Sequence, residues 1–440
     1  MALSDDQVRE VLGVYAELGP APTPERSALP ELRRGRRPAR RPPTQVTLVE
    51  RNGLAVWEWG AKRRPLSAPG RARRAGGPSA PASREIFSDI LQPLGVNQIG
   101  ELLLDFDCKR NPAIDRTHGW KLQQWYDDRQ KLGDSTPTEA KSVLVIVHGT
   151  ASCADHIVSE IQLAEGGTKL LADAAKHYSA VLAFEHPTVS MSPVLNALDL
   201  SAALAPYGNC AVDIVCHSRG GLVASWWMHV IDSPLRKKRC VFVGSPLQGT
   251  NLANPAKFRS SLHLLASYGR VLGNVGVAAG FLALPMTILK VAASVVDFTA
   301  KTPLLDAAMA MIPGLGAQSS TKNNQELIRL NARKSLGQGA PTHFYIRANF
   351  ASKNEGWRFW RYFTNHPKLR LIDAAVDTFV FPGENDLVVD TDSMLDAVSG
   401  PEFKFPSEDG IVHHTNYFEQ KQTVEKIREW LAIPEEASLP

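Results

Sequence analysis

Residues 211–222 read AVDIVCHSRGGL, and this stretch decides the fold. Its first part is a continuous apolar run, which is typical of a strand buried on both faces of a sheet. The run stops at Ser218, and Gly220 and Gly221 open a stretch with helical character. Glycines let a helix pass close to a turn without a Cβ clash. The pattern therefore predicts a strand, a sharp turn and a helix, with the Ser218 hydroxyl raised above the sheet.

Apolar runs of the same kind lie on both sides of this stretch, and stretches of helical period separate most of them. The runs are SVLVIVHGT (142–150), SAVLAFEHP (179–187), CVFVGSP (240–246) and DTFVFPGEND (377–386). Strands that are apolar throughout, rather than alternating between apolar and polar residues, indicate an α/β protein when helices separate them. Such a protein has a mostly parallel sheet covered by helices on both faces. Ligand-contacting side chains in such a sheet come from the carboxyl ends of the strands, which is where Ser218 is expected.

A candidate acid stands just past the expected end of the last apolar run. We choose Asp386, because it follows the strand and would lie at the same edge of the sheet as Ser218. Glu384, Asp390 and Asp392 remain alternatives. Asp377 precedes the same strand and would point to the opposite edge.

A candidate base lies in the stretch GIVHHTNYFEQKQTVEKIREWL (410–431), whose second half has helical period. We expect Asn416 to cap this last helix, with Glu419 completing a capping box. A histidine in the preceding loop could reach the serine and be oriented by the acid. We choose His414, which is nearer the helix, and keep His413 in reserve. The two histidines could also be a metal pair or plain loop residues, but no acidic cluster completes a metal site, so no metal is expected.

The three candidates follow one another in the order Ser218, Asp386, His414, which is the chain order of α/β-hydrolases and differs from that of chymotrypsin and subtilisin. The serine turn resembles the G-x-S-x-G nucleophile elbow of that fold, with Cys216 in place of the first glycine. VGSPLQGTNLA (243–253) is similar to the stretch that follows the next strand in triacylglycerol lipases and GPI inositol-deacylase-like proteins.

Residues 142–253 and 375–432 thus resemble the lipase/esterase branch of the α/β-hydrolases. The resemblance implies a serine hydrolase that cleaves carboxylic esters and needs no cofactor. It also implies an oxyanion hole made of backbone N–H groups. One donor would be Arg219, which follows the serine, and the other would be Thr150 or Ala151, in the loop after an earlier strand.

An insertion separates the resembling segments, and we expect residues 254–340 to form a helical, apolar cap over the serine. Within it, residues 271–289 carry no charged side chain. Their length could span a bilayer, but a single span would leave Ser218 and His414 on opposite sides of the membrane. We therefore expect a lid that favours apolar or acyl-chain esters. A buried core helix pair or a membrane-contacting segment remains the alternative.

The N-terminal part is expected to be an extension (1–84) attached to the hydrolase domain (85–440). Residues 1–18 resemble an amphipathic helix with Ser4 as its N-cap. Residues 45–60 alternate around Asn-Gly, which predicts a β-hairpin. The intervening segments are linkers rich in Arg and Pro.

Positive charge is concentrated in residues 33–74, which hold thirteen Lys or Arg and two Glu, a net +11. The whole chain is +4, so the rest is −7, which argues against a nucleic-acid partner. Five cysteines in no zinc-like spacing favour a reducing compartment. With no secretion signal apparent, we expect a cytoplasmic protein. A peripheral membrane contact through the cap or the basic arm remains an alternative.

The leading hypothesis is a carboxylic-ester hydrolase acting on a small-molecule or lipid ester. Two other functions stay open. The same three residues could carry acyl transfer or amide cleavage. The fold could also serve as a non-catalytic binding or membrane-surface module, in which case Asp386 or His414 would lie far from Ser218.

Overall fold

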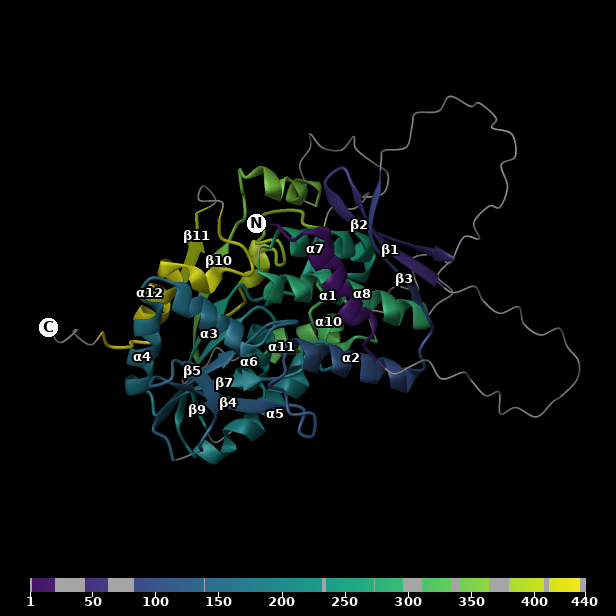
Figure 1. Cartoon of the computed structure of the whole chain (residues 1–440). Helices are drawn as coiled ribbons and strands as arrows, with labels where there is room; N and C mark the ends of the chain where they lie inside the picture. Colours follow the sequence, from purple (N-terminus) through teal and green to yellow (C-terminus); the bar gives the residue numbers. More distant parts are fainter. Residues whose placement is uncertain are drawn as a thin grey trace, which may run out of the picture.

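The computed structural model describes residues 2–19, 44–61, 83–137, 139–231, 235–272, 274–295, 311–333, 340–363, 380–406 and 411–435. These residues form a large sheet flanked by helices, and a second group of helices and strands packed at one end of it (Figure 1). The linkers expected at 19–43 and 62–83 lie almost entirely outside the described residues.

The large sheet has eight strands in the order β11-β10-β9-β8-β6-β7-β4-β5. Their bounds are β4 Lys121–Tyr126, β5 Lys131–Asp134, β6 Ser142–Val147, β7 Ala180–Glu185, β8 Ala211–His217, β9 Arg236–Val243, β10 Thr342–Ala348 and β11 Glu402–Phe405. The strands from β7 across to β11 are parallel to their neighbours, whereas β4 runs antiparallel to β7 and to β5. The sheet is therefore mostly parallel, as the apolar runs predict.

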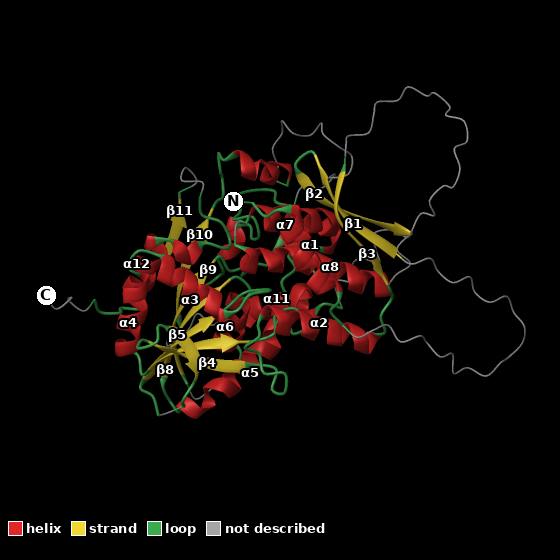
Figure 2. Ribbon diagram, in the orientation of Figure 1, coloured by secondary structure: helices red, strands yellow, loops and turns green. Residues whose placement is uncertain are grey.

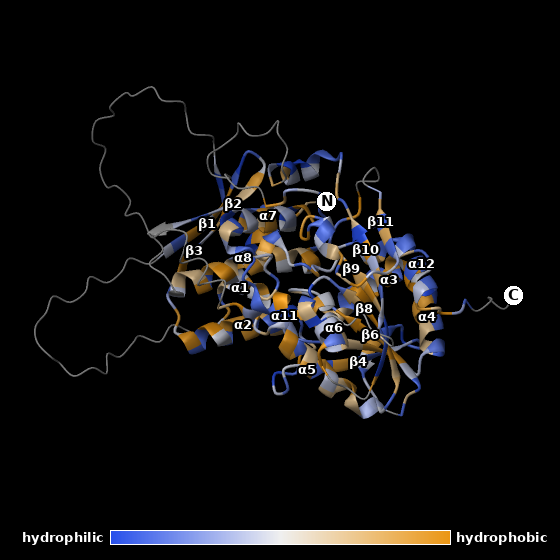
Figure 3. Ribbon diagram, turned by 180° about the vertical axis from the view of Figure 1, so that it is seen from behind, coloured by the Kyte–Doolittle hydropathy of each residue, from blue (hydrophilic) through white to orange (hydrophobic). Residues whose placement is uncertain are grey.

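Helices cover both faces of this sheet (Figure 2). On one face lie α3 Ala154–Leu163, α4 Gly167–His177 and α12 Lys421–Trp430; on the other lie α5 Pro193–Leu204, α6 Gly220–His229 and α11 Gln325–Arg333. Successive residues of β6 enter opposite clusters: Val145 packs with α5 and α6, and Ile146 packs with α3 and α4. A strand with an apolar layer on each side must be apolar throughout, which is why the central strands do not alternate. In Figure 3 these strands are mainly orange.

The second group of elements forms one further hydrophobic cluster. It combines α7 Phe258–Val271 and α8 Val275–Val295 of the insertion with N-terminal elements, namely α1 Asp5–Ala16, β1 Thr44–Arg51, β2 Leu54–Ala61, β3 Arg84–Leu91 and α2 Val96–Arg110. The strands pair in the order β2-β1-β3. The N-terminal segment is thus part of the cap, and the boundary expected at residue 84 falls at the first residue of β3.

Local predictions in this region agree with the structure. Ser4 caps α1 in a capping box with Gln7. Asn52 and Gly53 both have positive φ, 52° and 80°, and join β1 to β2 as a tight hairpin. The segment 85–135, where the sequence shows no clear pattern, contains β3, α2, β4 and β5.

Two predictions near the C-terminus are wrong. The strand expected at 377–386 does not occur in its described part, 380–386, which is made of turns and isolated bridges; Asp377 lies outside the described residues. The strand that pairs with β9 on this side of the sheet is β10. The last helix, α12, begins at Lys421 rather than after Asn416, because a short 3₁₀ turn, η7 Tyr417–Glu419, comes first. The Asn416 side chain instead accepts the His413 N–H at 2.8 Å.

Helix α8 is long and apolar enough to cross a membrane by length and composition alone. However, 72% of its most apolar window is buried inside the protein, against α1, α2 and α7. The core helix of a soluble protein meets the same criterion, so α8 is weak support for a membrane span. The remaining short helical segments are η1 Ala205–Tyr207, η2 Asn251–Ala253, η3 Pro255–Lys257, α10 Pro313–Gly316, η4 Glu355–Tyr362 and η6 Thr391–Met394.

Candidate active site

Ser218 lies in a sharp turn between β8 and α6, as predicted. Its φ is +54°, a left-handed conformation that non-glycine residues rarely adopt, and its N–H donates to the carbonyl of Val243 at 3.0 Å. A Cβ on Gly220 would overlap the Val147 carbonyl, and one on Gly221 would overlap the Ser245 side chain. The glycine pair is needed because α6 starts directly against the neighbouring strands.

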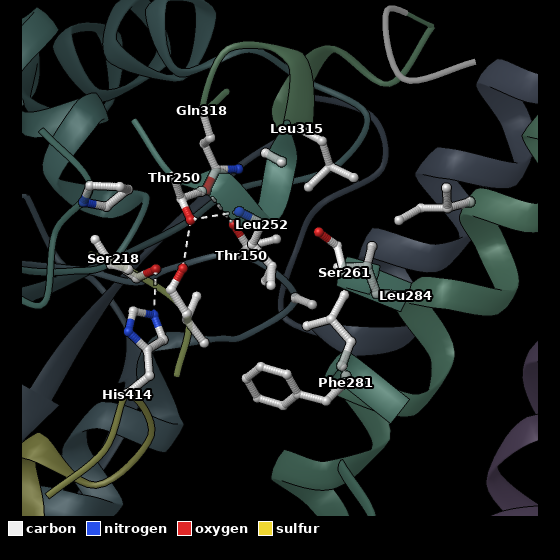
Figure 4. Close-up of a pocket in the computed structure, with 18 of the residues that line it drawn as sticks. Thr150, Ser218, Thr250, Leu252, Ser261, Phe281, Leu284, Leu315, Gln318 and His414 are labelled. Atoms are coloured by element: carbon white, nitrogen blue, oxygen red, sulfur yellow. Dashed lines mark hydrogen bonds between the residues drawn. The ribbon is translucent and has the colours of Figure 1, made fainter. Parts of the chain in front are cut away.

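Ser218, His414 and Asp386 form one chain of hydrogen bonds. Ser218 Oγ lies 2.8 Å from His414 Nε2, and His414 Nδ1 lies 2.7 Å from Asp386 Oδ2. Figure 4 shows the Ser218–His414 pair. All three side chains are buried. With Nδ1–H donating to the carboxylate, Nε2 is free to accept the serine proton, which is the tautomer that a general base needs.

Asp386 lies in the loop between β10 and β11 and is fixed by five further hydrogen bonds, one of them from its own N–H to the Val389 carbonyl at 3.1 Å. Its Oδ1 accepts the N–H groups of Val388 and Val389 at 3.0 and 2.8 Å. Its Oδ2 also accepts from the Tyr417 hydroxyl at 3.0 Å. The His414 N–H donates to the Asp386 carbonyl at 3.0 Å. The carboxylate and the imidazole are therefore oriented by their own loops.

The reserve base and the alternative acids lie elsewhere. His413 is held 3.1 Å from the Tyr268 hydroxyl, and burial lowers its pKa to about 4. Glu384 pairs with Lys404. Asp390 accepts from the Asn251 amide at 2.8 Å, and burial raises its pKa to about 6. None of them bonds to Ser218 or His414.

Of the three backbone N–H groups considered for the oxyanion hole, one already takes part in a hydrogen bond. The N–H of Ala151 donates to Thr188 Oγ1 at 3.0 Å. Among the described residues, the N–H groups of Thr150 and Arg219 have no hydrogen-bond partner. The site therefore offers Thr150 and Arg219, and Ala151 is engaged. Gly149 is required here, because a Cβ at that position would lie 2.7 Å from Ser218 Cβ.

The side chain of Arg219 is buried away from the serine. It donates to the Met191 carbonyl at 2.6 Å and to Asn196 Oδ1 at 2.7 Å, and burial lowers its pKa to about 10. His217, on the other side of the serine, donates from Nε2 to the His414 carbonyl at 2.8 Å. Burial holds the pKa of His217 well below its ordinary value, so it braces the His414 loop as a neutral ring.

The loop after β6 is held by side chains from α2, which the sequence did not single out. Asp107 accepts the Thr188 hydroxyl at 2.9 Å, and Arg110 donates from Nε to the Ala151 carbonyl at 3.1 Å. Behind this loop, buried Glu185 accepts the Asn111 amide at 2.6 Å and the Ala154 N–H at 3.1 Å. Burial raises the pKa of Glu185 to about 7.

An apolar cavity of about 770 Å³ opens beside Ser218 (Figure 4). Its walls come mainly from α7, α8 and the loops after β9 and β10, and include Leu252, Leu262, Leu265, Phe281, Leu284, Ile288, Leu315 and Val388. The polar side chains in its lining are Thr150, Ser218, Thr250, Ser261, Gln318 and His414.

Neither a metal cluster nor a disulfide is found in the described part of the chain. No group of three or more His, Cys, Asp or Glu side chains there could hold an ion. The five cysteines are free thiols, and four of them are buried.

The strand order, the serine elbow and the position of Asp386 and His414 after β10 and β11 define an α/β-hydrolase fold. The chain belongs to the family described as a domain of unknown function, DUF7379, whose model matches residues 113–432. A search of curated proteins finds no match.

Solved structures with distant similarity include three lipase structures. The propeptide form of Bacillus licheniformis lipase BlEst2 is 14% identical, and the match covers 73% of this chain and 55% of that chain (TM-score 0.40). The mature form is also 14% identical, and the match covers 72% of this chain and 99% of that chain (TM-score 0.39). Lipase 1 from Pelosinus fermentans is 12% identical, covering 68% and 100% (TM-score 0.40). This chain therefore spans about half the length of the BlEst2 propeptide form.

Proposed function

We propose that this protein is a serine hydrolase that cleaves carboxylic esters with apolar acyl groups. The observation that carries the proposal is the hydrogen-bonded chain from Ser218 Oγ through His414 to Asp386, with two unpaired N–H groups and an apolar cavity beside it. The non-catalytic alternative would separate these residues, so their contact distances argue against it.

The reaction starts when Ser218 Oγ attacks the ester carbonyl carbon while His414 Nε2 takes the hydroxyl proton. The negative charge that develops on the carbonyl oxygen is stabilised by the N–H groups of Arg219 and Thr150. Asp386 holds the imidazole in the correct tautomer and stabilises the imidazolium. The bond between the acyl carbon and the alcohol oxygen then breaks, and His414 gives its proton to the leaving alkoxide.

The acyl group remains bonded to Ser218 Oγ until water enters. His414 takes a proton from this water, which attacks the acyl carbon, and the Ser218–acyl bond breaks with return of the proton to Oγ. No cofactor takes part in these steps. The acyl chain lies in the apolar cavity, where each buried methylene contributes up to about 0.8 kcal/mol. These features support membership of the lipase/esterase branch of the fold.

Labelling with a fluorophosphonate probe tests the proposal, because the probe reacts with an activated serine. We expect covalent labelling of the intact protein and none of Ser218→Ala, together with hydrolysis of p-nitrophenyl esters by the intact protein alone. Ser225→Ala, at a buried serine of α6 whose hydroxyl has no hydrogen-bond partner among the described residues, serves as a matched control that keeps its label. A folded intact protein that is not labelled, with detergent present to open the cap, would falsify the proposal.

A further inference from the structure

A second cavity also borders Ser218. It shares Thr150, Ala151, Ser218, Phe281 and His414 with the apolar cavity, so the two join at the serine. Beyond these residues its walls combine the polar side chains of Arg110, Ser152, His156, Glu160, His217 and Thr415 with the apolar side chains of Ile157 and Val277. A third hollow shares His156, Glu160, Val277 and Thr415 with it and reaches the exposed residues Ser159 and Glu419. Its apolar lining residues are Leu163, Val271, Leu272, Val277 and Trp357. We call the second and third hollows together the polar channel.

Phe281 of α8 lies at the junction of the two sides (Figure 4). An ester bound at Ser218 must place its acyl chain on one side and its alcohol on the other. The acyl chain gains free energy in the apolar cavity, whereas in the polar channel it would cover polar groups without pairing them. The alcohol therefore lies in the polar channel, with its oxygen near His414, which protonates it.

The channel presents hydrogen-bonding groups with little net charge. The Arg110 guanidinium already donates to the carbonyls of Ala151 and Gly276, at 3.1 and 2.8 Å. Burial and the neighbouring Arg110 lower the pKa of His156, so its ring is neutral. Burial, reinforced by Glu419, holds the pKa of Glu160 well above its ordinary value, which favours the uncharged form of that carboxyl.

The other titratable groups at the channel are also uncharged or face solvent. His217 and His413 are neutral, because burial lowers the pKa of each. Glu419 is exposed at the outer end, and partial burial of its carboxyl raises its pKa. Donors and acceptors of this kind match hydroxyl groups best.

We infer, on the basis of the proposed function, that the preferred substrates are esters between one apolar acyl chain and an uncharged polyol, as in a monoacylglycerol. The polyol hydroxyls pair with Glu160, His156 and Thr415 in the polar channel. An alkyl ester with the same acyl chain offers these groups no hydroxyl partner. The apolar side chains of the channel are interspersed with polar ones, so a second acyl chain would cover polar groups there.

The experiment compares substrates with one acyl chain and different alcohols, below their micellar concentrations. We expect kcat/KM for 1-monooctanoylglycerol to exceed that for ethyl octanoate by at least about tenfold, because a site that pairs hydroxyls discriminates against an analogue without them. We also expect it to exceed that for octanoyl lysophosphatidylcholine. Equal or reversed preferences in a protein that hydrolyses p-nitrophenyl octanoate would overturn this inference alone.

Two variants link the preference to the channel. Glu160→Leu and His156→Leu should each reduce the ratio of glycerol ester to ethyl ester severalfold, while the preference for acyl chain length stays unchanged because the apolar cavity is intact. Glu160→Gln, which keeps an uncharged donor and acceptor, should retain most of the ratio. Glu101→Gln, at an exposed position of α2, should leave it unchanged.

The outcomes separate the two proposals. No fluorophosphonate label and no turnover of any ester removes the proposed function and this inference with it. A labelled, active protein whose ratio is unaffected by both leucine variants contradicts the polar channel as the alcohol site and leaves the hydrolase activity standing.

Discussion

Arg110 donates from Nε to the carbonyl oxygen of Ala151 at 3.1 Å, so helix α2 holds the loop that carries Thr150, the proposed oxyanion donor. The amino side of Ala151 is held as well. Its N–H donates to the Thr188 hydroxyl, which itself donates to Asp107 of the same helix, α2. Because the N–H and the carbonyl of Ala151 are both hydrogen-bonded, the N–H of the preceding residue, Thr150, is oriented before a substrate binds. Electrostatic preorganisation requires such an arrangement.

The Thr188 hydroxyl is predicted to position this loop. Thr188→Val removes the hydroxyl with little change in shape and leaves the Ala151 N–H unpaired, while Asp107 Oδ1 keeps the N–H groups of Thr188 and Val189. We expect kcat for a p-nitrophenyl ester to fall by roughly 10-fold or more with a smaller change in KM, since losing an oxyanion donor outright costs about 10²–10³. Thr188→Ser keeps the hydroxyl and should restore most of kcat. Equal kcat values for the two variants would contradict a positioning role.

Asp386 is predicted to set the tautomer of His414. In Asp386→Asn the side-chain oxygen can still accept the N–H groups of Val388 and Val389, which directs the amide nitrogen toward His414 Nδ1. His414 would then carry its proton on Nε2 and could not accept from Ser218. We expect a loss of kcat of about 10⁴ with an unchanged melting temperature. A loss below tenfold would mean that another group orients His414.

Glu185 is predicted to make stability depend on pH. Burial raises its pKa from 4.5 to about 7, and burial lowers the pKa of the adjacent His148 to about 3, so at low pH the pair is buried without charge. Between pH 4.5 and 7 Glu185 binds more protons in the folded protein than in the unfolded chain, whereas His148 binds fewer between about pH 3 and pH 6.5. The Glu185 contribution to the free energy of unfolding therefore falls as pH rises through its window and levels off above about pH 7, and the His148 contribution has the opposite sign.

Glu185→Gln cannot ionise and mimics the protonated carboxyl. Relative to the unchanged protein, we expect the variant to gain up to about 3 kcal/mol of stability between about pH 4.5 and about pH 8. Denaturant unfolding at both pH values measures this difference and cancels the titration of groups that the two proteins share. A difference that stays constant with pH would show that Glu185 is ionised throughout.

Leu284 of α8 is predicted to limit the acyl chain, since it lines the apolar cavity and is buried. Leu284→Trp fills part of this volume and should move the optimum in a series of p-nitrophenyl esters to shorter chains. Each methylene excluded costs up to about 0.8 kcal/mol, roughly a fourfold change in kcat/KM. The control is Leu195→Trp, at an exposed leucine of α5, which should keep the original optimum. The same optimum in both variants would place the acyl chain elsewhere.

Local patterns in the sequence were enough for much of the fold. A strand buried on both faces must be apolar throughout, so β6, β7, β8 and β9 are visible as continuous runs. The turn at Ser218 is visible because only glycines fit where α6 starts against β6 and β9. The hairpin at Asn52 is visible because its backbone needs positive φ.

The acid and the last helix show where such patterns fail. The apolar residues before Asp386 resemble a strand, but they pack against the cap cluster, where Val380 and Phe381 are buried. Asp386 still reaches His414, because the turn made by its own carboxylate with Val388 and Val389 sets its direction. Local spacing likewise suggested Asn416 as a helix cap, whereas its side-chain oxygen accepts a hydrogen bond from the His413 N–H.

The sequence by itself determined the class of sheet, the serine turn and the chain order of Ser218, Asp386 and His414, because these depend on burial and backbone conformation within a few residues. Only the tertiary structure decided that the N-terminal segment builds the cap, that Asp107 and Arg110 hold the loop at Ala151, and that a polar channel joins the apolar cavity at Ser218. These depend on contacts between residues dozens to hundreds of positions apart, which no local pattern records.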